Sequence, residues 1–75
     1  MENITERQTR LDKLEDYSAS LEADIQSAKE QLLNEQDKTH IIFLDDHLNM
    51  LNYELDKANA DIYLLRQRIK KFQLS

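Results

Sequence analysis

Apolar residues in the second half of the chain recur at alternating steps of three and four residues. This stripe consists of Ile41, Leu44, Leu48, Leu51, Leu55, Ala58, Ile62, Leu65, Ile69 and Phe72. On a helix such a stripe follows one side, and only a second helix can cover it along its length. The pattern therefore predicts a long amphipathic helix over residues 39–74 that forms a coiled-coil seam.

A second stripe, with two interruptions, runs along the first half of the chain. It consists of Ile4, Leu11, Leu14, Leu21, Ile25, Ala28 and Leu32. Arg7 and Ser18 fill two positions of the same heptad frame, and polar residues in a seam fix its register at some cost in stability. The pattern predicts a helix over residues 3–34, which Asn3 is suited to cap.

The two stripes are out of phase by two residues. At about 100° per residue, this offset turns the second stripe to nearly the opposite face of a continuous helix. The change of phase coincides with residues 34–40, the longest stretch without an apolar side chain. We expect a register break here, with Asn34 ending the first helix in a left-handed conformation and Asp37 or Thr39 capping the second.

Two all-α architectures fit these stripes. In the first, the chain turns at the break and forms an antiparallel helical hairpin, which then self-associates into a helical bundle. In the second, one continuous helix pairs in parallel with a copy of itself as a coiled-coil homodimer. The hairpin matches the two seams and centres the turn on the polar run.

Charges beside the seams favour the continuous helix instead. A parallel pair would bring Arg10 near Glu15, whereas the hairpin would bring Asp24 near Glu54 and Arg10 near Arg68. Exposed charge pairs contribute only about 0.3–0.5 kcal/mol each. A single seam kept through the break would expose several leucines, at about 1.5–3 kcal/mol each. The hairpin is therefore favoured, and the continuous helix is the alternative.

The composition agrees with a chain made of helices. Its 75 residues include no Gly, no Pro and no Cys. Gly and Pro punctuate chains into turns, so their absence favours long helices, and the absence of Cys excludes disulfides. We expect one coiled-coil domain over residues 1–75. A chain this short has a marginal core, so we expect it to form a homo-oligomer, with a dimer favoured.

The charge and apolar runs exclude several classes of partner. The chain has 15 acidic and 10 basic residues, a net charge of −5, and residues 14–37 hold seven acids against Lys29. Nucleic-acid binding is not expected, because phosphate contacts need a basic stripe. No apolar run is long enough for a signal peptide or a membrane span. We therefore expect a soluble protein of the cytoplasm or another intracellular compartment, without membrane contact.

The sequence shows no catalytic or metal-binding pattern. His40 and His47 are seven residues apart, whereas a zinc site on one helix needs ligands four apart. No Ser or Thr has a base and an orienting acid in a recognisable pattern, and no glycine loop is present to hold a phosphate. We expect no enzyme activity, no cofactor, no metal and no small-molecule substrate.

The opposite side of the second helix carries further apolar residues. Phe43, Met50, Tyr53 and Leu64 lie along it with Ala60 and Leu74, interrupted by Asp46, Lys57 and Gln67. A helix that is apolar on two faces has two neighbours, and aromatic residues and Met are enriched where proteins meet. This face predicts either self-assembly of two hairpins or docking of a helix from a different protein.

The sequence therefore predicts a coiled-coil assembly protein, which oligomerises and serves as a scaffold for another helical protein. One alternative is a small acidic chaperone or inhibitor that binds a single target through the Phe43–Leu64 face. In that case the acidic stretch 14–37 would contact a basic surface of the target. A further alternative is a rod-like structural spacer, which would be elongated and need no partner.

Overall fold

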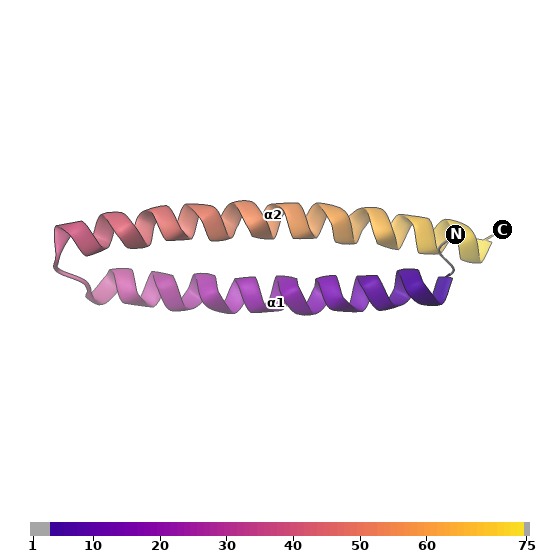
Figure 1. Cartoon of the computed structure of the whole chain (residues 1–75), viewed down its shortest axis with the longest axis horizontal. Coiled ribbons are helices and arrows are strands. Elements are labelled where there is room, and N and C mark those ends of the chain that lie inside the picture. The colour runs from indigo at the N-terminus through magenta and orange to yellow at the C-terminus, as the bar shows by residue number, and fades with distance from the viewer. Residues whose placement is uncertain (1–3, 75) are drawn as a thin grey trace.

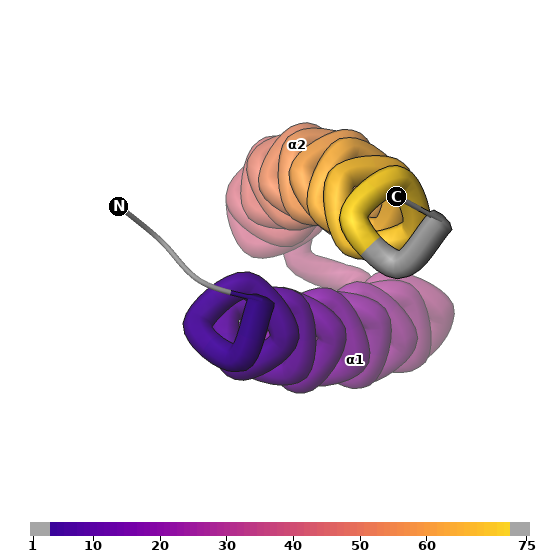
Figure 2. Tube along the Cα trace, turned by 90° about the vertical axis from the view of Figure 1, so that its right-hand side faces the viewer, coloured from indigo at the N-terminus to yellow at the C-terminus, as the bar shows by residue number. Residues whose placement is uncertain are grey.

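The chain forms an antiparallel helical hairpin. A computed structural model describes the backbone of residues 4–74 and the side chains of residues 4–72. Within that range there are two helices, α1 (Ile4–Asn34) and α2 (Lys38–Leu74), of 31 and 37 residues. They lie side by side in opposite directions (Figure 1), and the end-on view in Figure 2 shows α2 stacked on α1.

This arrangement confirms the predicted all-α hairpin. The molecule measures 56 × 19 × 14 Å, whereas a continuous helix of about 70 residues would be roughly 105 Å long. The continuous helix is therefore wrong as the fold of this chain. Asn3, the predicted cap at the start of the 3–34 helix, lies outside the described part. The same is true of the side chain of Leu74.

The turn is shorter than the predicted break at 34–40, because only residues 35–37 are non-helical. Hydrogen bonds within the turn explain its length. The Glu35 carboxylate accepts the backbone N–H groups of Gln36 and Asp37 at 3.1 and 3.0 Å. The Asp37 carboxylate accepts the N–H of Thr39 at 3.0 Å and so caps α2. Asp37 as the cap is confirmed, while Thr39 lies inside α2.

The end of α1 corrects a second expectation. No residue of the described backbone has a positive φ angle, so Asn34 is not left-handed. Its side-chain amide donates instead to the Glu30 carbonyl at 3.1 Å, and the Glu35 N–H donates to the Leu32 carbonyl at 3.4 Å. These two bonds satisfy carbonyl groups in the last turn of α1, which a left-handed residue otherwise helps to do.

The apolar stripes of the two helices pack against each other in two clusters. The cluster nearer the turn contains Leu21, Ile25, Ala28, Leu48, Leu51 and Ala58, with Leu32 and Leu55 partly buried beside it. The cluster nearer the chain ends contains Leu11, Ile62, Leu65 and Ile69, with Ile4 and Leu14 partly buried beside it. Burial of these side chains is what joins the helices, because most of a helix's stability in a protein comes from its packed face.

A polar contact lies between the two clusters. Ser18 is buried, and its hydroxyl donates a hydrogen bond to the Asn59 side-chain oxygen at 3.0 Å. This bond satisfies the hydroxyl of a residue that interrupts the apolar stripe of α1, so its burial carries no unpaired donor.

Charged groups beside the seams find partners within the hairpin that differ from those expected. Glu54, expected near Asp24, accepts a hydrogen bond from the Tyr17 hydroxyl at 3.4 Å. Glu15 pairs with Arg66 at 3.3 Å between oxygen and nitrogen. These side chains reach diagonally across the seam, whereas Arg10 and Arg68 line one groove, as expected for the hairpin.

Candidate interaction surface

The residues of the predicted seam lie between the helices to different depths. Four are partly buried, namely Leu14, Leu32, Ile41 and Leu55. The buried ones are Leu11, Leu21, Ile25, Leu44, Leu48, Leu51, Ile62, Leu65 and Ile69. These seam side chains are already packed within the hairpin. Among the described residues, a surface for a partner must therefore lie outside the seam.

Phe72 differs from the rest of the seam, because its side chain is 54% exposed. It lies at the open end of the hairpin, where the neighbouring side chain on α1 is Arg7. The guanidinium carbon of Arg7 lies 5.4 Å from the centre of the Phe72 ring, a geometry that allows a cation–π interaction. The seam thus ends in an arginine–aromatic contact rather than in an apolar layer.

The largest exposed apolar side chains of α2 include the four predicted to form a partner face. Phe43, Met50, Tyr53 and Leu64 are 65%, 58%, 66% and 52% exposed. Their spacing puts them on the side of α2 opposite its buried seam, and we call them the outer face of α2. Each retains more than half of its surface in water, so each has apolar area to lose on binding.

The outer face belongs to a longer stripe that also contains polar residues. The stripe repeats the steps of three and four and consists of Phe43, Asp46, Met50, Tyr53, Lys57, Ala60, Leu64, Gln67 and Lys71. All of its members are exposed. It therefore has the spacing of a helix-packing seam, but α1 does not bury it.

Phe43 lies between two histidines, an arrangement that the sequence analysis did not identify. Its ring centre is 6.3 Å from that of His40 and 6.4 Å from that of His47, and the His47 ring is nearly parallel at 11°. The spacing of three and four residues around Phe43 was the available signal, because such neighbours meet on a helix. These contacts hold the phenylalanine at the turn end of the outer face.

His40 also links this end of the outer face to the turn. Its Nδ1 atom contacts the Glu35 carboxylate. The backbone N–H of Asp37 lowers the pKa of Glu35 below its ordinary value of 4.5, and His40 and the N–H of Gln36 act in the same direction against partial desolvation. The turn is therefore built around a carboxylate that is most stable when ionised.

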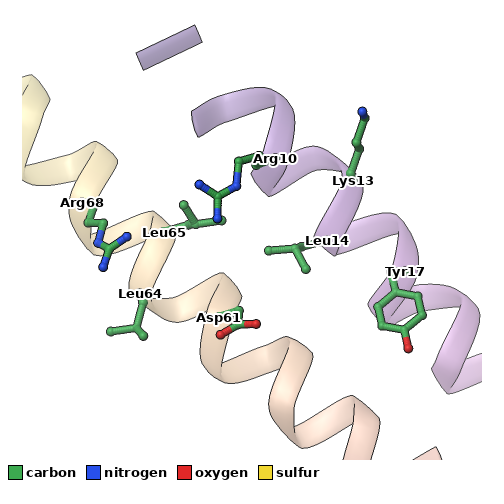
Figure 3. Close-up of a pocket in the computed structure, with 8 residues that line it drawn as sticks. All are labelled: Arg10, Lys13, Leu14, Tyr17, Asp61, Leu64, Leu65 and Arg68. Atoms are coloured by element: carbon green, nitrogen blue, oxygen red, sulfur yellow. The ribbon is translucent and has the colours of Figure 1, made fainter. Parts of the chain in front are cut away.

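A groove of about 450 Å³ lies where the two helices meet near the open end. It is lined by Arg10, Lys13, Leu14, Tyr17, Asp61, Leu64, Leu65 and Arg68 (Figure 3). Leu14 and Leu65 form its apolar floor between the helices, while Leu64 points away from α1. The groove therefore adjoins the outer face of α2 through Leu64.

The lining of the groove combines charged side chains with an apolar floor. Its lining holds three basic side chains and Asp61, but no Ser, Thr, Cys or His.

Residues 4–74 have no structural feature of a metal site or of a membrane span. This part of the chain contains no cluster of three or more His, Asp or Glu side chains placed to hold a metal ion. Neither helix, as far as it is described, has a stretch apolar enough to cross a membrane. No protein-family model, curated protein or solved structure matches this sequence.

Proposed function

We propose that this chain is a non-enzymatic assembly module, a coiled-coil hairpin that forms a homodimer and holds another helical protein as a scaffold. The observation that carries this proposal is the outer face of α2. Its four large apolar side chains have the spacing of a packing seam and remain more than half exposed in the single chain. A face of this kind is stable in water when a second helix covers it.

The free energies of burial and of association indicate that several contacts must act together. Fully burying one side chain of these types contributes about 1.5–3 kcal/mol. Association costs roughly 4–15 kcal/mol in lost freedom of motion. One or two contacts cannot offset that cost, whereas the outer faces of two copies together can. Phe43 and Tyr53 supply the aromatic anchors that tend to dominate such interfaces.

The test is the mass of the chain in solution. Sedimentation equilibrium over a range of concentrations is expected to give twice the chain mass of 8.9 kDa for the wild type. Tyr53→Glu places a charge in the outer face and is expected to shift the mass to that of one chain. Leu33→Glu is the matched control, since Leu33 is 85% exposed on α1 and away from that face, so this variant should remain a dimer.

A wild type of 8.9 kDa at every concentration would reject self-assembly. If Leu33→Glu dissociated the dimer as completely as Tyr53→Glu, the outer face would not be the contact surface. Both substitutions lie at exposed positions, so both variants are expected to keep their helix content. Circular dichroism of the two variants measures that content.

A monomeric wild type would favour the second candidate, an acidic helical chaperone or inhibitor that binds one target through the Phe43–Leu64 face. The distribution of charge supports this candidate. The half of the hairpin nearer the turn, residues 22–54, has eight acidic and two basic residues. Such a surface would attract a basic target and reject nucleic acid.

A further inference from the structure

The two ends of the hairpin carry opposite net charge. The turn half, residues 22–54, has a net charge of −6. The open half, residues 4–21 and 55–72, has six acidic and eight basic residues and a net charge of +2. Two hairpins that lie side by side in the same direction would bring like halves together. Opposite directions bring the acidic half of each onto the basic half of the other.

The stripe that contains the outer face shows the same asymmetry residue by residue. Its charged members are Asp46 near the turn, Lys57 in the middle and Lys71 near the open end. In a parallel pair each would face its own copy, giving three like-charged contacts inside the interface. Like charges directly opposite each other destabilise a helix pair.

We infer that a second copy of this chain docks on the α2 stripe antiparallel, with Asp46 facing Lys71 and Tyr53 facing Leu64 of the second copy. In the same register Met50 faces Gln67 and Lys57 faces Ala60. Every charged member of the stripe then meets an opposite charge or a neutral residue. This inference rests on the proposed self-association and adds its orientation and register.

Cysteine cross-linking tests the register, and the chain has no native Cys to interfere. Two cysteines can form a disulfide only when their Cα atoms lie within about 7 Å. In the antiparallel dimer, Tyr53→Cys mixed with Leu64→Cys is expected to give a covalent dimer on oxidation. Each variant alone should give none, because the two copies of one position lie about 16 Å apart along the helix axis.

Ala23→Cys is the control for random collision, since Ala23 is exposed on the far helix. A dimer in which Tyr53→Cys or Leu64→Cys alone cross-links efficiently would overturn the antiparallel orientation. A dimer that gives no cross-link above the Ala23→Cys level would overturn the use of this stripe. A monomeric mass rejects the proposed self-assembly itself, so the two failures are distinguishable.

Charge reversal provides an independent test that needs no disulfide. Asp46→Lys and Lys71→Glu are each expected to raise the dissociation constant about tenfold, because each places like charges together twice in the dimer. The double variant is expected to return the constant to near the wild-type value. In a parallel pair, each single reversal only exchanges one like-charged contact for another, so unchanged affinity in the single variants would contradict the inference.

Discussion

At the scale of single residues, Glu35 shows how the chain turns without glycine. Its carboxylate accepts two backbone N–H groups of the turn and contacts His40. Helices often end at a glycine that adopts a left-handed conformation. Here the Asn34 amide and the Glu35 N–H donate to α1 carbonyls, and the Glu35 carboxylate accepts the N–H groups of the turn, without any positive φ angle in the described backbone. The turn therefore depends on the charge of one partly buried carboxylate.

This dependence predicts a pH effect. The pKa of Glu35 is lowered in the folded chain from its ordinary value of 4.5. The ionised Glu35 carboxylate therefore stabilises the folded chain fully above pH 4.5. This contribution is lost as the pH falls through the pKa that Glu35 has in the folded chain. Glu35→Gln, which keeps an acceptor but no charge, should melt below the wild type at neutral pH and together with it in strong acid. A gap in melting temperature that persists in acid would contradict this origin.

Asp37 acts on the first turn of α2. Its carboxylate accepts the Thr39 N–H, and its own carbonyl accepts the N–H of Ile41 at 2.9 Å. Asp37→Ala removes the side-chain acceptor and is expected to destabilise the hairpin by about 0.5–2 kcal/mol in urea unfolding. Asp37→Asn keeps an acceptor of the same shape and should lose much less. Equal losses in the two variants would show that the cap does not act through this bond.

At the scale of helices, the apolar seam holds α1 and α2 together. Leu65 is 3% exposed within the cluster near the chain ends. Leu65→Ala leaves a cavity there and is expected to reduce the free energy of unfolding by about 2–5 kcal/mol. Leu33→Ala makes the same chemical change at an exposed position and should cost less than about 0.5 kcal/mol. Urea unfolding of both variants at one protein concentration compares the two values.

The sequence predicted these helices well because their stripes are regular. The seam of α2 keeps its spacing through ten positions, and the offset at Leu32 and Ile41 placed the turn within a few residues. Glu35 was not predicted, because nothing distinguishes it from neighbouring acids until the turn brings its carboxylate to the backbone. The Tyr17–Glu54 and Glu15–Arg66 pairs were missed for a related reason, since they depend on how far each side chain reaches.

The outer face of α2 was visible in the sequence only as a set of residue types. The stripe predicted that Phe43, Met50, Tyr53 and Leu64 would share a side of the helix, and the structure places all four in solvent. The ring contacts of Phe43 with His40 and His47 required the helix geometry. The charges within the same stripe, Asp46, Lys57 and Lys71, were equally visible in the sequence.

At the scale of the whole molecule, a dimer of hairpins must be distinguished from an exchange of helices. Two chains that open at the turn could each pair α1 with α2 of the other and keep the same seam contacts, because such swapping exchanges identical elements. A three-residue turn and a regular seam are compatible with both forms. Mass alone cannot separate them, since each contains two chains.

A distance within one chain separates the two forms. Cysteines at Gln8 and Gln67, labelled and diluted with excess unlabelled protein, report energy transfer within single chains. In the hairpin these positions lie near each other at the open end, roughly 10–20 Å apart, whereas an opened helix would separate them by about 90 Å. We expect high transfer, unchanged as the concentration passes through the monomer–dimer transition. Transfer that is high in the monomer and falls on dimerisation would mean that assembly opens the turn, and the charges of Glu35 and Asp37 would then control assembly as well as folding.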